Sequence, residues 1–429
     1  MFGLGQLGTL GLASSRQNPA WVLAGAAVDL DFAHGRAFGA PPASLAVSRA
    51  SIAYANDSFG QWLAFAANAL RLTDRGILLE ESRSNGIRNN AAQGIVVGTL
   101  GAGGALPTYW DNYSVSNGIT VSILGAGSEV GVNYVDIRLQ GTPSLTTNQR
   151  LAFDTQIAAA NGQTWAMSAF IKVAGGSLTN VGSCLFAHQF RDGAGVSLTV
   201  STGPPFTPTG TLARYGAVGT ATHASTALVE PELNIGLVNG QAIDVTFRIG
   251  WPQQELGAFV TSPIRTTGAA ATRAGDVVTL TGLVFGPAFS VYAQGVSAIN
   301  PGSAVGAPRL INLGDGTINN CVELLLEGNS GRPDDLLRRG GVIAYNTQLA
   351  SAGYAGQSVK LATALAAGDQ AAAAAGALTT HAAASIIAPS VLTIGASAGG
   401  GAQWNGFVER VALWPTTRIP NAMLVEMTR

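Results

Sequence analysis

Two adjacent carboxylates, Glu80 and Glu81, first raise the question of whether this chain carries out catalysis. They lie in the stretch GILLEESRSNGIRNN, residues 76–90, together with Arg83 and Arg88. Two carboxylates can hydrolyse a glycosidic bond when they converge on it from about 5–10 Å apart. Neighbouring residues of a strand point to opposite faces of the sheet, so this pair does not converge. We therefore expect both acids to pair with Arg83 or Arg88 and to satisfy buried backbone groups.

A polysaccharide-degrading enzyme would need other acids that converge, for instance from the set Asp136, Asp192, Glu230 and Asp315. No spacing in the chain selects a pair from this set. The sequence contains no HExxH motif and no GxSxG or P-loop motif in a suitable context, and its four histidines do not fall at metal-binding spacings. We therefore expect a protein that is not an enzyme.

Metal ligands are also sparse. Cys184 and Cys321 have neither a CxxC partner nor a histidine at zinc spacing, so we expect both to be small core residues. Asp192 and Asp315 lie in Asp-Gly turns, where a plain hairpin turn and an oxygen-rich calcium loop both remain open. We expect no cofactor, with calcium as the one ion left open.

Aromatic residues make up only 7% of the chain, so their clusters stand out. Sugar sites combine aromatic walls with a few fixed polar groups, and the stretch LPTYWDNY supplies both. A tryptophan at the start of a sandwich strand also suits a core, as we expect for Trp165 and Trp414. The residues expected to bind carbohydrate are the exposed aromatics and their polar neighbours: Tyr109, Trp110, Asp111, Asn112, Trp251, Trp404 and Asn405.

Short alternating runs separated by turn residues predict the elements that must position these side chains. Examples are ITVSILG, VNYVDIRLQG, VSLTVSTG and IDVTFRIGW. In VDIRLQ the alternation places Val135, Ile137 and Leu139 on one face. Such a pattern is typical of antiparallel β-sandwiches. The turn at residues 73–76 favours a hairpin, and IPNAMLVEMTR predicts a final helix with Pro420 in its first turn.

A chain of 429 residues is too long for one ordinary domain. The predicted fold class is mostly β, with tandem antiparallel β-sandwiches (jelly rolls) behind an N-terminal attachment unit. The expected boundaries are 1–97 for the N-terminal arm and attachment unit, 98–262 for the first sandwich, 263–275 for a linker and 276–429 for the second sandwich. The glycine-rich first 15 residues suit an arm that orders against a partner, or a frayed terminus.

The net charge of −1 and the pI near 6.4 give no long-range attraction to nucleic acid or to an anionic membrane. No run of about 20 apolar residues could span a bilayer. The N-terminus lacks the basic start and unbroken apolar run of a signal peptide. We expect neither nucleic-acid binding nor membrane insertion.

The stretch from Ser48 to Asn90, SRASIAYANDSFGQW followed later by GILLEESRSNGIRNN, resembles a segment of phage virion proteins. In tail-fibre, spike and related proteins of tailed phages, prophages and gene transfer agents it reads roughly sRaS…GlLiEesRTN…N. Ser84 replaces the usual Thr here. The resemblance implies a structural lead-in to jelly-roll domains, with no catalytic role.

Two looser resemblances cover the rest of the chain. Residues 98–262 are similar to jelly rolls of carbohydrate-binding modules, through LPTYWDNY and NGQTWAMSAFIK. Residues 270–429 resemble concanavalin A-like (laminin-G-like) sandwiches, through WNGFVERVALWPTTRIPNAML.

These resemblances imply a virion-surface protein, a tail-fibre or head-spike subunit that binds host cell-surface polysaccharide. Its N-terminal region would contact other virion proteins, and by analogy with fibres and spikes we expect a homotrimer. Two alternatives remain open: a connector or decoration protein without a ligand, since jelly rolls also build capsids and tails, and a polysaccharide depolymerase.

Overall fold

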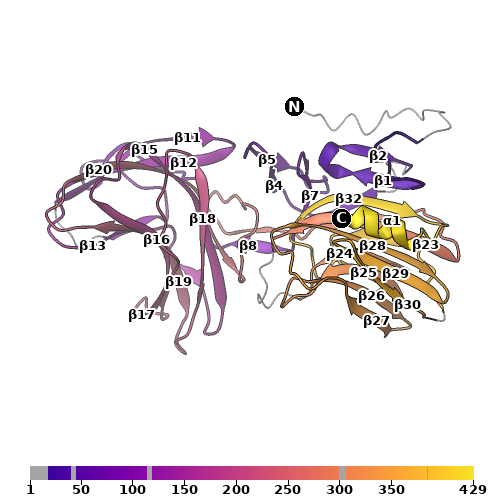
Figure 1. Ribbon diagram of the computed structural model, residues 1–429. Helices are drawn as coiled ribbons and strands as arrows, with labels where there is room; N and C mark the ends of the chain where they lie inside the picture. The colour runs from indigo at the N-terminus through magenta and orange to yellow at the C-terminus, as the bar shows by residue number, and fades with distance from the viewer. Residues whose placement is uncertain (1–17, 40–44, 114–117, 299–305, 384) are drawn as a thin grey trace. The chain divides into compact units, whose positions relative to one another are not determined.

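The computed structural model describes residues 18–39, 45–113, 118–298, 306–383 and 385–429 (Figure 1). The predicted N-terminal arm lies outside these residues. The described chain folds into several antiparallel sheets with one α-helix, so the predicted mostly-β sandwich class is confirmed. Within the described residues no helix has the length and apolarity to cross a membrane.

Contacts divide the chain into two units that differ from the expected domains. Unit 1 consists of residues 1–59, 64–82 and 274–429, and unit 2 consists of residues 60–63 and 83–273. In sequence, unit 2 is therefore inserted into unit 1. The expected tandem of an attachment unit and two consecutive sandwiches has to be corrected accordingly.

Unit 1 is built from two antiparallel sheets. The nine-stranded sheet contains, in order, β2 (Arg36–Phe38), β1 (Val28–Asp31), β32 (Gly406–Trp414), β23 (Ala288–Ser297), β28 (Ser358–Ala366), β29 (Asp369–Ala374) and β30 (Ala377–His381), with β7 (Gly76–Leu79) on β32 and β6 (Leu72–Thr73) on β7. The seven-stranded sheet contains β27 (Val342–Gln348), β26 (Pro333–Arg339), β25 (Cys321–Leu326), β24 (Arg309–Gly314), β31 (Val391–Ile394), β22 (Val277–Leu280) and β3 (Leu45–Ser48).

The N-terminal segment supplies strands to both of these sheets, which is why it is not a separate unit. Leu30 of β1 lies opposite Val411 of β32, and β3 pairs with β22. The Arg410 guanidinium donates to both carboxylate oxygens of Asp29, at 2.9 and 2.6 Å, across the β1–β32 pair. Local alternation predicts strands here but does not reveal partners more than 200 residues away.

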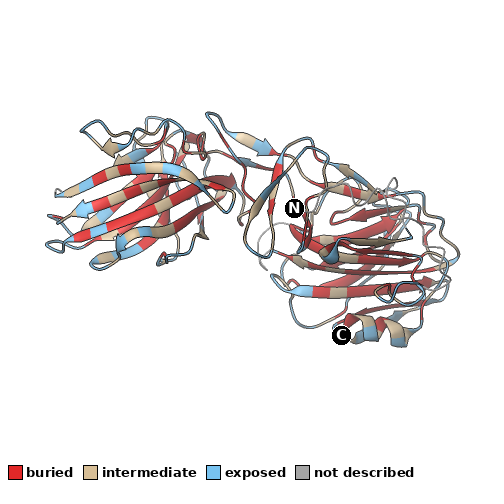
Figure 2. Ribbon diagram, turned by 90° about the horizontal axis from the view of Figure 1, so that it is seen from above, coloured by how far each residue is buried: buried red, intermediate tan, exposed pale blue. Residues whose placement is uncertain are grey.

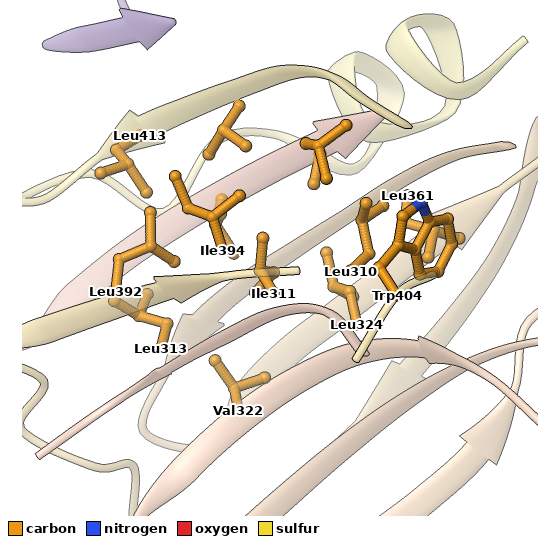
Figure 3. Close-up of a cluster of buried hydrophobic side chains, with 14 of the residues drawn as sticks. Leu310, Ile311, Leu313, Val322, Leu324, Leu361, Leu392, Ile394, Trp404 and Leu413 are labelled. Carbon is orange, nitrogen blue, oxygen red and sulfur yellow. The ribbon is translucent and has the colours of Figure 1, made fainter. Parts of the chain in front are cut away.

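The core of unit 1 lies between its two sheets (Figure 3). Trp404 stands among Leu310, Leu324 and Leu361, and its indole N–H donates to the Phe407 carbonyl at 3.1 Å. A second apolar layer covers the outer side of the nine-stranded sheet, where α1 (Asn421–Thr428) packs. Pro420 caps α1, so the predicted final helix is confirmed, with Pro420 one position before the first turn.

Unit 2 is a second sandwich of two six-stranded sheets. The β19 sheet contains β10 (Asp111–Tyr113), β13 (Thr147–Ala152), β19 (Leu228–Leu237), β16 (Val181–Arg191) and β17 (Ser197–Thr202), with β14 (Ile157–Ala158) on β19. The β20 sheet contains β18 (Ala213–Thr220), β15 (Thr164–Ser177), β20 (Ile243–Leu256), β12 (Val132–Gly141), β11 (Ile119–Glu129) and β9 (Gly98–Thr99). Buried positions recur along these strands (Figure 2).

Two local predictions are confirmed. Val135, Ile137 and Leu139 point into the core of unit 2, with exposed fractions of 1% or less. Thr73 pairs with Gly76 in the hairpin that joins β6 and β7. The remaining short elements are η1 (Phe32–His34), β4 (Ala53–Asn56), β5 (Trp62–Phe65), β8 (Arg83–Asn85) and β21 (Ala271–Arg273).

The long segment of unit 2, residues 83–273, begins and ends at one pair of strands, because β8 and β21 are antiparallel with Arg83 opposite Arg273. Residues 263–275 were expected to form a linker between domains, and the structure corrects this expectation. Ile264 and Thr266 are buried, and the Ile264 carbonyl accepts hydrogen bonds from the amides of Asn85 and Asn90, at 3.1 and 2.9 Å.

Candidate functional site

Glu80, one of the two acids of the stretch 76–90, belongs to a buried network of ion pairs. In unit 1, Arg71 donates to Glu80 at 2.7 Å and also pairs with Asp276. Arg49 donates to the other oxygen of Asp276 at 2.9 Å, and all four side chains are buried. Arg88 forms its ion pair with Asp154 in unit 2, so the expectation that Arg88 is the partner of a motif glutamate is wrong.

The asparagines of the same stretch bind backbone groups within unit 2. Asn85 accepts from the amides of Ile87 and Gln254, at 3.1 and 3.0 Å. Asn89 donates to the carbonyls of Gln93 and Thr108, at 2.9 and 3.0 Å. The asparagines therefore satisfy backbone groups of irregular segments, a role that was expected of the two glutamates and not of the asparagines.

Most of the residues expected to bind carbohydrate are buried, and this part of the prediction is corrected. Trp110, Trp251, Trp404 and Asn405 have exposed fractions of 7, 1, 0 and 2%. The Trp110 indole donates to the Asn89 carbonyl at 2.9 Å, and Asn405 accepts from the Glu81 amide at 2.9 Å. A large indole ring stabilises the folded state most when it is buried, so these rings lie in the interior.

The other expected residues lie nearer to the surface. Tyr109 is 38% exposed, with the Arg88 guanidinium 3.9 Å from its ring centroid. Asp111 is exposed on β10, whereas Asn112 is half-buried and accepts a hydrogen bond from Gln149. Because Asp111 is exposed on the edge strand β10, it lies at the edge of the candidate site that the β19 sheet forms.

The outer face of the β19 sheet gathers the polar side chains that could form a site. On β19 itself Val229, Leu233 and Ile235 enter the core, so the residues between them point outward. Across neighbouring strands Arg150 lies opposite both Tyr113 and Asn234. We name this surface the polar face and define it by seven residues: Tyr113, Arg150, Gln189, Arg191, Glu230, Glu232 and Asn234.

Two carboxylates are buried on the polar face and hold its arginines. Arg191 donates to both oxygens of Glu230, at 3.0 and 3.2 Å. Arg150 donates to Glu232 at 3.3 Å, and each acid is 1% exposed. A buried carboxylate is stable only when charged or hydrogen-bonding partners surround it, so these contacts fix the side chains in place.

The electrostatics of the polar face follow from this burial. Burial, together with the nearby Glu230 and against the effect of Arg150, raises the pKa of Glu232 to about 7. Burial and the negative charges of Glu230 and Asp111 raise the pKa of Tyr113 to about 12. At neutral pH the Tyr113 hydroxyl is therefore neutral, and Glu232 is partly protonated.

The outer face of the β20 sheet differs, because its charges neutralise one another. Arg248 donates to both oxygens of Asp136 at 2.9 Å and stacks on the Tyr134 ring at 3.6 Å. Arg138 donates to Asp244 at 2.7 and 2.6 Å. Asp136, named above as a candidate catalytic acid, is therefore engaged in an ion pair away from Glu230.

The remaining acids and the cysteines have local roles. Asp192 accepts from the amides of Ala194 and Val196, and Asp315 accepts from Thr317 and Asn320 within its own turn. Cys184 and Cys321 are buried free thiols, as expected for core residues. Across the described ranges, no three His, Cys, Asp or Glu side chains gather as metal ligands would.

The sequence prediction missed Arg150, Glu232 and Asn234. The run LVEPELNIGL carries a signal for two of them, because acids and an amide alternate there with apolar residues. Alternation of this kind predicts a strand with one polar face. It does not reveal that β13 and β10 place Arg150 and Tyr113 beside that face.

The matches found for this chain are to solved structures. No protein-family model and no curated sequence matches it. A sialidase CBM40 module of Ruminococcus gnavus is 18% identical over 33% of this chain and 82% of that one, with a TM-score of 0.28. The CBM22-1 xylan-binding domain of Paenibacillus barcinonensis Xyn10C is 15% identical over 42% and 95%, with a TM-score of 0.25. Its CBM22-1–CBM22-2 tandem is 11% identical over 79% and 96%, with a TM-score of 0.25.

Proposed function

We propose that this protein binds polysaccharide without cleaving it, as a fibre or spike subunit on the surface of a phage or phage-like particle. The observation that carries the binding proposal is the polar face. It presents hydrogen-bonding side chains that buried acids hold in place, beside the half-buried ring of Tyr113. Sugar recognition needs this combination of an apolar ring and fixed polar groups.

Preorganisation of the polar face favours binding of a flexible polymer. The two arginines and Tyr113 are held by ion pairs and ring contacts, with the Arg150 guanidinium 5.4 Å from the Tyr113 ring centroid. Side chains that are already ordered lose little entropy when a ligand arrives. A single contact of this kind commonly has a Kd near about 1 mM, or about −4 kcal/mol. Several copies, as in the homotrimer that we propose, would raise the avidity.

The proposal of a virion location rests on the resemblance of residues 48–90 to the lead-in segment of phage virion proteins. The absence of a catalytic role is supported by the use of Glu80 in a buried network with Arg71 and Asp276. The N-terminal region, which we expected to contact other virion proteins, keeps that role in the proposal. Six of its described strands, β1 to β4, β6 and β7, belong to unit 1, so unit 1 is the part proposed to attach to the particle.

The test is binding of the full-length protein to host cells with and without their surface polysaccharide, with free reducing ends measured in the same tubes. Capsule-dependent binding without new reducing ends is the expected result. New reducing ends would overturn the non-enzymatic assignment. Binding that is equal on both kinds of cell, or no binding, would favour the connector or decoration role.

The polar face is tested in the same assay with Tyr113→Ala, which removes the ring. We expect the affinity to fall about tenfold, which corresponds to about 1.4 kcal/mol. Tyr113→Phe keeps the ring and should bind within about threefold of wild type. An unchanged affinity of Tyr113→Ala would place the binding surface elsewhere.

A further inference from the structure

Arg150 differs from the other arginine of the polar face in how far its hydrogen-bonding capacity is used. Arg191 donates to both oxygens of Glu230 and to the Gly195 carbonyl. Among the described residues Arg150 makes one side-chain hydrogen bond, the 3.3 Å contact with Glu232. Its side chain is 35% exposed. A guanidinium has five N–H donors in a planar fork, so most donors of Arg150 remain available to a ligand.

Asn234 provides an acceptor next to this fork. It lies directly opposite Arg150 in the β13–β19 pair and therefore points to the same face. Only 6% of Asn234 is exposed, and its Oδ1 has no hydrogen-bond partner in the described part of the chain. A buried acceptor without a partner is unfavourable, so a ligand hydroxyl that reaches it would gain a hydrogen bond at little cost.

The charge of Arg150 is only partly balanced near neutral pH. Its partner Glu232 has a pKa raised to about 7 by burial and by Glu230, so it is partly protonated there. Glu230 is engaged by Arg191. The charged and titratable groups around Glu232 are Asp111 and Tyr113 on β10, Arg150 on β13, Glu230 on β19 and Arg191 on β16; β17 contributes none.

We propose that Arg150 and Asn234 form a subsite for a carboxylate-bearing sugar, so that the polysaccharide bound by this protein is acidic; this inference rests on the proposed function. The sugar carboxylate accepts two hydrogen bonds from the Arg150 fork. A hydroxyl of the same sugar donates to Asn234 Oδ1. The Tyr113 ring packs beside the sugar.

The subsite links binding to protonation of Glu232. When the ligand carboxylate takes the Arg150 fork, Glu232 loses part of the positive charge that favours its ionised form, and a second negative charge arrives. Both effects favour protonated Glu232 in the complex. Binding therefore takes up protons around pH 7, and the affinity falls as the pH rises from 6 to 8. The sugar carboxylate is ionised throughout this range.

The probes are immobilised alginate, polygalacturonate, hyaluronan and isolated host capsule, each intact and after chemical reduction of its carboxylates to alcohols. Dextran and xylan serve as neutral polymers. The full-length protein should bind at least one acidic polymer and lose about tenfold or more in affinity after carboxyl reduction, as expected for a charge-assisted hydrogen-bond pair. Equal binding to intact and reduced polymer, or binding to neutral polymers alone, would overturn the acidic subsite but leave the proposed function intact. Failure to bind any polymer would count against both.

One variant and a matched control assign the effect to the subsite. Arg150→Ala should lower the affinity for the acidic polymer about tenfold or more, and should lower the affinity for its reduced form much less. Arg138→Ala is the matched control, because Arg138 is 36% exposed and paired with Asp244. Both of these residues lie on the β20 sheet, whereas the polar face lies on the β19 sheet. The affinity of Arg138→Ala should stay within about twofold of wild type.

Glu232→Gln tests the proton linkage independently of overall affinity. Wild type should bind about three- to tenfold more weakly at pH 8 than at pH 6, since the pKa of Glu232 lies between these values. Glu232→Gln cannot ionise and should bind equally at both pH values. A wild-type affinity that does not change with pH, or a pH dependence that persists in Glu232→Gln, would contradict the subsite.

Discussion

Few residues of this chain are charged, yet several acids are buried, and Asp335 is the clearest case in unit 1. It lies on β26, is 0% exposed, and accepts a hydrogen bond from Thr363 at 3.3 Å. Burial raises the pKa of its carboxyl from 3.8 to about 7. The ring of Tyr345, on the neighbouring strand β27, stacks on His381 with 3.9 Å between the centroids. Asp335 is therefore an acid that the fold accommodates best when it is protonated.

Because the pKa of Asp335 is higher in the folded than in the unfolded state, the folded state holds the proton more tightly between about pH 4 and pH 7. Unit 1 should lose stability as the pH rises through this range. Asp335→Asn should reduce this loss by an amount on the order of 3 kcal/mol. Urea unfolding of wild type and of Asp335→Asn at pH 5 and pH 8 measures this change in stability.

Asp315 offers a control of opposite sign for the same experiment. Hydrogen bonds from Thr317 and Asn320 lower the pKa of this exposed carboxyl. The ionised Asp315 carboxylate therefore contributes to stability above its unfolded pKa, and this contribution is lost as the pH falls through its lower folded pKa. Asp315→Asn should therefore destabilise unit 1 at pH 8. Equal pH profiles for wild type and Asp335→Asn would contradict the role assigned to Asp335.

At the residue scale, tryptophan was the hardest residue to place from sequence. Trp165 and Trp414 were expected in cores because apolar strands surround them, and both are buried. Trp404 was expected at the surface because a glycine-rich loop precedes it, yet its ring enters the core of unit 1. A loop position describes the backbone, whereas the direction of the side chain depends on the space left between the sheets.

At the scale of elements, one buried network joins segments of unit 1 that are far apart in sequence. Asp276 lies just before β22, Arg49 follows β3, and Arg71 precedes β6. The Glu80 amide donates to Asp276 at 2.9 Å, and the Asp276 amide donates to the Glu80 carbonyl at 2.9 Å. Asp276 thus joins both arginines to the backbone at the end of β7.

Asp276→Ala should destabilise unit 1 by about 3–5 kcal/mol, because it leaves two buried guanidinium groups without their shared partner. The measurement is the shift of the unit 1 transition in urea. Asp369→Ala is the control, since the Asp369 side chain is 64% exposed and pairs with Arg418 at the surface. Its cost should stay below about 1 kcal/mol. Similar shifts for the two variants would mean that the network contributes little.

Local elements of this fold could be predicted, but their partners could not. The hairpin at Thr73–Gly76 and the alternation in β12 follow from turn chemistry and the two-residue period of strands. The pairing of β1 with β32 depends on which strand edges remain open once both sheets assemble. For the same reason Arg150 could not be assigned to the candidate site, since its neighbours Tyr113 and Asn234 come from other strands.

At the scale of the whole molecule, the long segment of unit 2, residues 83–273, is one continuous insertion between segments of unit 1. Arg83 and Arg273 face each other in the β8–β21 pair, so a two-residue turn can join them. The N-terminal strands cannot be separated in the same way, because β1, β3 and β7 belong to the sheets of unit 1.

Two deletions test this organisation. Replacing residues 84–272 by Asn-Gly should leave unit 1 folded, with one cooperative transition in urea. Deleting residues 1–82 should instead abolish folding of unit 1, because strands of both sheets are lost. Circular dichroism and limited proteolysis distinguish the outcomes. A folded protein after the second deletion would restore the expected attachment unit as an independent domain.

The pairing of β1 with β32 also determines how mechanical load passes through the chain. Residues 18 and 429 both belong to unit 1, and the long segment of unit 2 between them, residues 83–273, begins and ends at paired strands. A pull on segments before β1 and after β32 therefore acts on hydrogen bonds of the nine-stranded sheet and on the Asp29–Arg410 ion pair. We therefore expect unit 2 to carry no tension before β1 separates from β32. In a chain tethered through these segments, we expect the polar face to keep its geometry under load.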